Sequence, residues 1–230
     1  MSQYKTIGII GGMGPWAAVE FEKTLLELVG AEDDFGYPPI ICHNNTDIPD
    51  RATAMLEGGE SPVPALVRMA QNLIDCGAEI LCMPCNTAHY FFNDINKNLN
   101  HGIVFVNMIE CVCNTIKKCR INKVGLLATD ATIQTNLYQD KLVEINIELI
   151  APDDSHQKKV MKSIYGAQSL KAGNIEQPSA WLKEASDNLI SKGAEMIILG
   201  CTELPIGIKR LSVPLINSNL ELAKEVLQKA

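Results

Sequence analysis

The sequence predicts an α/β protein of two parallel-sheet domains of similar topology. Two observations lead to this prediction. Strand-like and helix-like segments alternate along the 230 residues, which is typical of parallel sheets covered by helices on both faces. In addition, residues 73–87 (LIDCGAEILCMPCNT) resemble residues 189–203 (LISKGAEMIILGCTE) without a gap, at an offset of 116 positions (189 − 73). A repeat of about half the chain length indicates a duplicated domain.

The individual elements follow from apolar runs and from residues that start helices. Pro15 stands at the expected first turn of one helix, and Ser61 is an N-cap candidate for another, with proline at its first turn. In the first half, strands are expected over residues 5–11, 39–43, 80–83 and 103–106, and helices over 16–29, 61–76 and 107–119. In the second half, strands are expected over 123–129 and 147–150 and in a run ending at 201, and helices over 131–144, 178–191 and 219–228.

The domain boundaries follow from the repeat. The first domain is expected over residues 1–106 and the second over residues 107–212. The segment 213–230 is expected to complete the first domain, because its helix can cross back. No linker-like stretch separates the halves, which indicates a broad interface between them.

Composition narrows the class of protein. A net charge of −7 argues against nucleic-acid and anionic-membrane partners, which require a basic face. No apolar run approaches the ~20 residues of a membrane helix, and no secretory signal is visible at the N-terminus. Eight cysteines in such a chain indicate reduced thiols rather than a disulfide framework. We therefore expect a cytoplasmic protein.

Polar clusters lie where predicted strands end. In open parallel sheets, ligands bind beyond the carboxyl ends of the strands. The clusters at such ends are residues 11–14, 44–51, 85–89, 129–130 and 201–203. This placement predicts a ligand site made from both halves, in the cleft between the domains.

Cys85 and Cys201 occupy matching places in the repeat. Each follows a buried strand and precedes a predicted helix, whose N-terminus would favour the thiolate. Two thiols on opposite faces of one carbon suit removal of a proton from one face and its return to the other. A single strand-end cysteine is more often a small buried hydrophobe. The matching pair favours a catalytic role for both cysteines over a purely structural one.

Other cysteine functions remain open in the sequence. Residues 82–85 (CMPC) fit the redox C-x-x-C pattern, but position 82 lies in the predicted strand and position 198 of the repeat is isoleucine. Cys82 and Cys85 could join Cys111 and Cys113 as zinc ligands, although the second pair lies in a predicted helix, a poor geometry for tetrahedral ligation.

Further residues near the strand ends are candidates for binding a small anionic ligand. Residues 12–17 (GMGPWA) fit the dinucleotide pattern G-x-G-x-x-A, yet the acidic residue expected after the second strand is absent. Arg51 can hold a carboxylate bidentately; Lys171 is a second cation, which composition alone assigns to the solvated surface. Neutral donors are Asn86, Thr87, Thr129 and Thr202. His89 could be a partner for Cys85, although a structural histidine is the commoner case. Asp50 and Glu203 could tune the thiols, bind the ammonium group of a ligand or simply act as N-caps.

Five motifs taken in order resemble the cofactor-independent aspartate/glutamate racemase family, and most closely its aspartate racemase branch. They are residues 9–15 (IIGGMGP), 45–51 (NTDIPDR), 83–89 (MPCNTAH), 164–166 (IYG) with 171–173 (KAG), and 199–205 (LGCTELP). The resemblance extends over essentially the whole chain. The glutamate racemase branch has an Asp-Ser-Gly type motif in the first loop, so the Gly-Gly-Met-Gly-Pro start favours aspartate. Related broad-specificity racemases share that start.

The resemblance implies two α/β domains related by pseudo-twofold symmetry, usually assembled as a homodimer. It also implies a racemase that interconverts L- and D-aspartate without pyridoxal phosphate, and no metal is expected. It implies that Cys85 and Cys201 are the acid/base pair and that Arg51 and Lys171 recognise the side-chain carboxylate. Around the α-carboxylate it implies Met13, Asn86, Thr87, Thr129 and Thr202. The alternatives are glutamate or broad specificity, isomerisation or decarboxylation of a dicarboxylate, and an inert amino-acid-binding module. The presence of both cysteines speaks against decarboxylation.

Overall fold

The computed structural model describes residues 4–99 and 102–230. The chain forms two compact units. Unit 1 consists of the described residues up to 108 together with 219–230, and unit 2 consists of residues 109–218. Each unit contains a four-stranded parallel sheet with flanking helices, which confirms the predicted α/β class.

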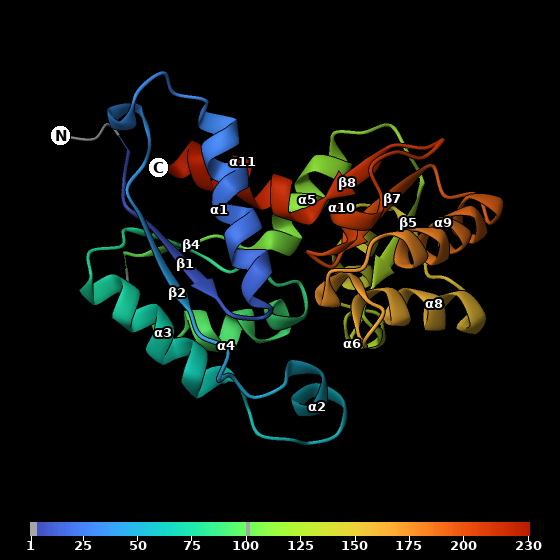
Figure 1. Ribbon diagram of the computed structural model, residues 1–230, viewed down its shortest axis with the longest axis horizontal. Helices are drawn as coiled ribbons and strands as arrows, with labels where there is room; N and C mark the ends of the chain where they lie inside the picture. Colours follow the sequence, from blue (N-terminus) through green and yellow to red (C-terminus); the bar gives the residue numbers. More distant parts are fainter. Residues whose placement is uncertain (1–3, 100–101) are drawn as a thin grey trace. The chain divides into compact units, whose positions relative to one another are not determined.

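Unit 1 is built around a sheet with the strand order β2-β1-β3-β4. Helices α1 and α3 both pack on β1 and β2, and Figure 1 shows them on either side of these strands. The strands are β1 (Ile7–Gly11), β2 (Ile40–Asn44), β3 (Ile80–Cys82) and β4 (Val104–Phe105). The helical elements are α1 (Pro15–Val29), η1 (Asp34–Gly36), α2 (Arg51–Leu56), α3 (Val63–Asp75), η2 (Thr87–Phe91) and α4 (Phe92–Asn96), with α11 (Ser218–Lys229) joining from the end of the chain.

Unit 2 repeats the arrangement with the strand order β6-β5-β7-β8. Two apolar clusters lie on its sheet: one includes residues of α5 and α7, and the other includes residues of α8 and α9. The strands are β5 (Lys123–Ala128), β6 (Glu148–Ile150), β7 (Met196–Gly200) and β8 (Leu215–Asn217). The helical elements are α5 (Met108–Lys117), α6 (Asp130–Gln134), α7 (Gln139–Val143), α8 (Asp154–Ile164), η3 (Leu170–Ala172), α9 (Glu176–Ser191) and α10 (Leu204–Gly207).

The Gly-Ala-Glu segment of the repeat, residues 77–79 and 193–195, has the same structural role in both units. Gly77 and Gly193 have φ of 99° and 93°, in the left-handed region that ends a helix. Glu79 accepts a hydrogen bond from the backbone N–H of Thr6 at 2.9 Å, and Glu195 accepts from that of Lys123 at 3.0 Å. Each carboxylate therefore ties the start of the third strand of its unit to the first.

A second shared feature is a glycine in the first strand of each unit. A Cβ on Gly8 would lie 2.8 Å from the Cβ of Ala78, and a Cβ on Gly125 would lie 3.3 Å from that of Ala194 and 2.9 Å from Leu189 Cδ1. Both strands thus need glycine so that α3 or α9, with the turn that follows it, can approach closely. The two units therefore share the same close contact between a strand and a helix turn.

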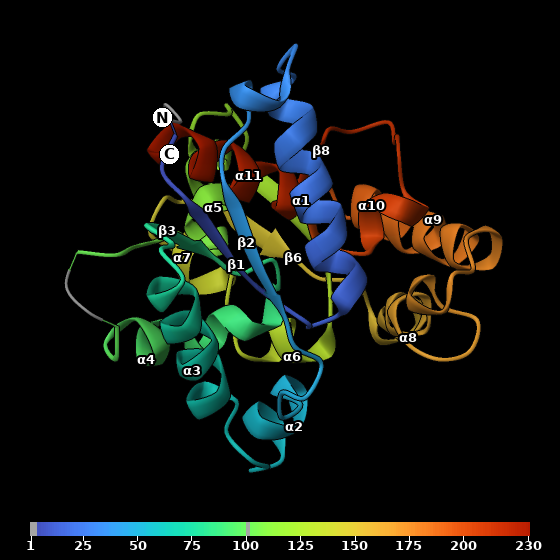
Figure 2. The same cartoon turned by 60° about the vertical axis from the view of Figure 1, so that its left-hand side comes forward.

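The last helix returns to unit 1. The backbone N–H of Lys5 donates to the carbonyl of Ala230 at 2.9 Å, so the end of α11 lies beside the approach to β1 (Figure 2). The apolar side chains of Leu222, Ala223 and Val226 on α11 are fully buried. Within the described ranges 4–99 and 102–230, the helices are all too short or too polar to cross a bilayer.

The structure differs from the sequence prediction in several elements. The helix expected over 131–144 is divided into α6 and α7, because Asn136 adopts φ 54° between them. Helix α8 and strand β8 were not anticipated. Asp153 caps α8 by accepting hydrogen bonds from the backbone of Ser155 and His156 at 3.0 and 3.1 Å, a signal that the sequence contained.

Candidate active site

Both sheets have the topological switch point that ligand sites use. In each unit the chain moves from the first strand to one neighbour, and then to the other neighbour on the opposite side. The crevice outside the carboxyl ends of those strands, between β1 and β3 and between β5 and β7, is where such folds bind ligands. In unit 2 the register pairs Ala128 with Gly200. Thr129 and Cys201, the next residues, therefore leave the sheet side by side.

The corresponding residues of unit 1 form the loop after β1 and the segment after β3. Gly12 has φ 102°, and a Cβ there would lie 1.6 Å from the backbone oxygen of Asn45. Glycine is needed here both for the positive φ and for the close contact between two backbones. Met13 follows and is 5% exposed, within the apolar core that also contains Cys85.

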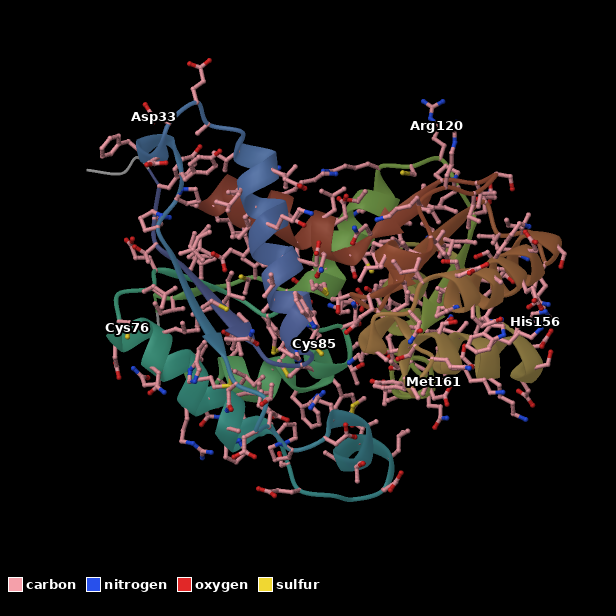
Figure 3. All side chains as sticks on the ribbon, in the orientation of Figure 1. Asp33, Cys76, Cys85, Arg120, His156 and Met161 are labelled. Atoms are coloured by element: carbon pink, nitrogen blue, oxygen red, sulfur yellow. The ribbon has the colours of Figure 1, made fainter. Side chains whose placement is uncertain are left out.

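Cys85 is held by the backbone around it. Its side chain lies inside unit 1, whereas Cys76 at the end of α3 lies at the surface (Figure 3). The N–H of Cys85 donates to the carbonyl of Met83 at 2.8 Å. Asn86 is 2% exposed and precedes η2, of which Thr87 is the first residue. The structure therefore brings Cys85, Asn86 and Thr87 to the end of β3.

His89 is a positioning residue for this segment. Its Nδ1 lies 2.8 Å from the carbonyl oxygen of Cys85, and its Nε2 accepts from the backbone N–H of Met108 at 3.0 Å. That pattern assigns the proton to Nδ1. Burial lowers the pKa of His89 to about 4, so the imidazole is neutral. The ring contacts the backbone of Cys85, and its stacking partner is Phe92.

Arg51 begins α2, directly after the polar loop that follows β2. Its Nη1 donates to the carbonyl of Pro49 at 3.3 Å, while its Nε is buried and has no hydrogen-bond partner in the described structure. Asp50, the neighbouring carboxylate, is occupied as the N-cap of α2 by accepting from Thr53 N–H at 2.8 Å. Among the described residues, Arg51 forms no ion pair, so its guanidinium has capacity for a ligand anion.

Unit 2 contains a cluster around Glu203, which is 4% exposed. Its Oε2 accepts from the Cys201 thiol at 3.0 Å and from the Thr202 hydroxyl at 3.1 Å, and its Oε1 lies 3.3 Å from Lys171 Nζ. Lys171 also lies over the ring of Tyr165, at 4.9 Å from the centroid. Composition alone assigned Lys171 to the solvated surface. That was wrong, since its side chain is 27% exposed and paired.

Thr129 follows directly after β5, at the same end of the sheet as Cys201. It caps α6 by accepting from the N–H of Thr132 at 3.3 Å, and the hydroxyls of these two threonines lie 3.0 Å apart. Thr129 is 3% exposed. The predicted residues of this unit, Thr129, Lys171, Cys201 and Thr202, thus gather around β5, β7 and η3.

We expected the helix after each cysteine to favour the thiolate. Those helices, η2 and α10, have only five and four residues. At Cys201 the shift is in the opposite direction. Burial and the adjacent Glu203 carboxylate raise the pKa of the Cys201 thiol well above its usual range, although Lys171 opposes them.

The remaining cysteines of the redox and zinc hypotheses have structural settings. Cys82 lies in β3, fully buried, and its thiol donates to the carbonyl of Gly8 at 3.5 Å. Cys111 and Cys113 are buried on α5. No group of three or more His, Cys, Asp or Glu side chains in the described part of the chain is arranged to hold a metal ion.

Comparisons with known proteins identify the family. The family model described as Asp/Glu/Hydantoin racemase matches residues 10–226. The chain belongs to this family. It is 34% identical to the aspartate racemase of Picrophilus torridus, with a TM-score of 0.82 over 98% of this chain and 94% of that one. It is 29% identical to an aspartate racemase homologue from Pyrococcus horikoshii OT3, with a TM-score of 0.80 over 98% of both chains.

A curated relative gives the same class of enzyme. The broad specificity amino-acid racemase RacX of Bacillus subtilis (strain 168) is 29% identical over 96% of both chains. This protein is therefore an amino-acid racemase, an isomerase of the Asp/Glu racemase family. In this racemase, sequence reasoning named Glu203 without a definite role and missed the packing of Tyr165 against Lys171. The signal for Tyr165 was its position six residues before Lys171 in the motif that carried the resemblance.

Proposed function

We propose that the racemase interconverts L- and D-aspartate by 1,1-proton transfer between Cys85 and Cys201, without pyridoxal phosphate or a metal. One observation supports this mechanism above the others. The two cysteines are the reactive side chains that follow the third strand of two sheets with the same strand order, at the switch point of each. A duplicated fold with a thiol at both switch points suits a reaction with two equivalent faces.

The mechanism requires both thiols to act on one α-carbon. The thiolate of one cysteine removes the α-proton, and the thiol of the other delivers a proton to the opposite face. Each turnover exchanges the protonation states of the two cysteines, so one cysteine is the base for L-aspartate and the other is the base for D-aspartate. Donors around the α-carboxylate stabilise the negative charge that develops on the carbon and its carboxylate; Asn86, Thr87, Thr129 and Thr202 are proposed for this role, with Met13 against the substrate.

Aspartate is proposed because two cations suit a second carboxylate. Arg51 has a buried Nε without a partner, and Lys171 is held by a carboxylate that a substrate can replace. The 34% identity to the Picrophilus torridus enzyme favours the same substrate. Broad specificity is the second candidate, favoured by the 29% identity to RacX over nearly the whole chain. The family resemblance also supports a homodimer, which sedimentation analysis of the purified protein would test.

The test is incubation of the purified protein with L-aspartate in D₂O without added cofactor. The wild type is expected to form D-aspartate and to incorporate deuterium at the α-carbon. Cys85→Ala and Cys201→Ala are each expected to abolish racemisation, whereas Cys76→Ala, which removes an exposed thiol at the end of α3, retains it. Activity that survives in either active-site variant would contradict the two-thiol mechanism.

Parallel incubations with L-glutamate and with neutral and basic amino acids separate the two substrate hypotheses. Turnover confined to dicarboxylic amino acids supports the proposed roles of Arg51 and Lys171. Comparable turnover of neutral or basic amino acids would replace aspartate by broad specificity and leave the thiol chemistry unchanged.

A further inference from the structure

The Glu203 carboxylate has an unusual set of partners for a buried residue at the start of a helix. Glu203 stands in the N-cap position of α10, yet its side chain makes no capping hydrogen bond. Its oxygens instead face a thiol, a hydroxyl and an ammonium group. A buried carboxylate costs free energy unless it is paired and hydrogen-bonded, so this arrangement commits the charge to Cys201 and Lys171.

We propose that Glu203 accepts the proton of the Cys201 thiol and thereby generates the thiolate that acts as base. The inference rests on the proposed racemase mechanism, in which Cys201 must be a thiolate for one enantiomer. Glu203 acts through Cys201 and is a positioning and proton-holding residue.

The geometry supports direct transfer. The thiol already donates to Oε2 at 3.0 Å, so the proton needs no intervening water. The S–H bond of Cys201 breaks and an O–H bond forms on Glu203, which leaves a thiolate beside a neutral carboxyl group. The thiolate then takes the α-proton of the substrate, so an S–H bond forms as the C–H bond breaks. The proton on Glu203 remains available to neutralise Cys201 when it is next a thiolate without substrate.

The same step overcomes the electrostatic obstacle at Cys201. A thiolate formed by loss of the proton to solvent would stand next to the Glu203 anion, and the two like charges would repel. Transfer to Glu203 removes that charge as the thiolate forms, so the number of negative charges in the cluster stays constant. Thr202 already donates its hydroxyl to Oε2 at 3.1 Å and helps to hold the carboxyl group in place.

Lys171 connects this step to the substrate. Its ammonium lies 3.3 Å from Glu203 Oε1 and is the counter-charge of that carboxylate. A side-chain carboxylate of the substrate would compete for Lys171. Glu203 then loses part of its counter-charge and becomes the stronger acceptor at the moment when Cys201 is required as base.

The carboxylate next to the catalytic cysteine is present in only one of the two repeats. At the repeat offset of 116, Glu203 corresponds to Thr87 (203 − 116). Unit 1 therefore has a hydroxyl where unit 2 has a carboxylate. The second carboxylate in the repeat, Glu195, accepts hydrogen bonds from the backbone N–H groups of Asn122 and Lys123. It is a structural residue and gives a matched control.

The experiment compares Glu203→Gln, Glu203→Asp and Glu195→Gln with the wild type. Glutamine keeps the shape and can still accept a hydrogen bond, but it cannot take the proton. We expect Glu203→Gln to lower kcat/KM for aspartate by about 10²- to 10⁴-fold, the usual range for loss of a proton-transfer group. Glu203→Asp is expected to regain part of this loss, and Glu195→Gln to remain within a few-fold of the wild type.

Two further readouts separate proton transfer from a structural role. In Glu203→Gln, kcat/KM is expected to rise steadily toward alkaline pH, because hydroxide replaces the carboxylate as acceptor while Lys171 and Thr202 are unchanged. Alkylation of Cys201 by iodoacetamide, followed by peptide mass spectrometry at neutral pH, is expected to become slower in Glu203→Gln than in the wild type, because the carboxylate that takes the thiol proton is missing. Faster alkylation would mean that Glu203 acts only as an anion that opposes the thiolate, and would overturn the inference.

The outcomes are distinguishable from failure of the proposed function. A wild type that neither racemises aspartate nor exchanges its α-proton would overturn the racemase mechanism, and the alkylation rates would still report on the thiol–carboxylate pair. The inference itself is overturned if Glu203→Gln keeps wild-type kcat/KM. It is also overturned if Glu203→Asp is no better than Glu203→Gln and alkylation of Cys201 is unchanged. A thermal unfolding curve for each variant identifies any that is misfolded, and Glu203→Asp then decides the question.

Discussion

At the scale of single residues, the unsatisfied Nε of Arg51 is the polar atom that most directly indicates a ligand. A buried donor without a partner costs about 1–3 kcal/mol. Asp50 does not remove this cost, because its carboxylate caps α2. A ligand carboxylate that accepts from Nε would satisfy the guanidinium and be held in a fixed orientation.

Replacement of Arg51 by methionine is therefore expected to weaken the use of aspartate. Loss of a charge-assisted hydrogen bond worth about 1.5–3 kcal/mol corresponds to a fall in kcat/KM of roughly 10- to 100-fold, carried mainly by KM. Steady-state kinetics with Arg120→Met as the control would measure it, because Arg120 lies at the surface of unit 2 (Figure 3). Equal effects of the two substitutions would refute a specific role for Arg51.

The chemistry-bearing residues were predictable from sequence to different degrees. Cys85 and Cys201 could be selected because the repeat aligned them. The raised pKa of the Cys201 thiol could not, since it arises from burial and from Glu203, and a sequence does not show which residue surrounds a thiol. The pairing of Lys171 with Glu203 joins residues 32 positions apart (203 − 171), and it depends on how η3 is placed against the end of β7.

At the scale of elements, the two units share one constraint between a strand and the helix that packs on it. The Cβ that alanine would add at position 8 lies 2.8 Å from both Ala78 Cβ and Leu81 Cδ2. Helix α3 and its turn would have to move away from β1. Cβ–Cβ contact of this kind gives little room for adjustment, because Ala78 has no rotatable side chain.

Gly8→Ala is accordingly expected to destabilise the protein by about 1–3 kcal/mol, the usual cost of overpacking a core. Gly125→Ala should have a similar effect of the same sign, since its added Cβ meets Leu189 and Ala194. Urea unfolding of both variants measures the cost. A midpoint equal to that of the wild type in either case would show that the helix can move without penalty.

The N-cap of helix α8 is expected to weaken in acid. The Asp153 carboxylate accepts hydrogen bonds from the His156 side chain, which has the largest effect, and from Ser155; these bonds lower the pKa of Asp153. A carboxyl group with a lowered pKa in the folded state stabilises the protein above its unfolded pKa, and that contribution disappears as the pH falls. The relevant range lies below about pH 4.

Asp153→Asn tests this cap, because asparagine is also a good N-cap residue but does not ionise. The wild type is expected to have the higher Tm at neutral pH, and the difference should shrink as the pH falls below about 4. Thermal unfolding from pH 3 to 7 gives the comparison. A difference that stays constant over this range would show that the charge of Asp153 does not matter for α8.

Several elements could be predicted because they carry local signals, and others could not. The strands and the long helices have apolar runs and helix-starting prolines. Strand β8 has three residues, and its pairing with β7 is what makes it a strand. The break between α6 and α7 depends on Asn136 in the left-handed region, a conformation that asparagine tolerates but does not require.

At the scale of the whole molecule, the chain leaves unit 1 after residue 108 and returns to it at residue 219. The sequence predicted such a return from the position of the last helix. It could not show where the helix binds, since that depends on contacts with residues more than 200 positions away, such as the bond from Lys5 to Ala230. Unit 1 therefore contains the most non-local contacts of the fold, and those are expected to form late.

Because the chain forms two compact units, a core substitution can be used to test the stability of each unit separately. Leu222 on α11 and Leu182 on α9 are both fully buried, but they belong to units 1 and 2. Truncation of a buried leucine to alanine costs about 2–5 kcal/mol. Leu222→Ala is expected to accelerate hydrogen exchange in β1 and β3 by roughly one to three orders of magnitude, while β5 and β7 change less. Leu182→Ala should do the reverse. Mass spectrometry of peptides covering these strands measures both patterns, and equal acceleration of all four strands by either substitution would mean that the two units open as one.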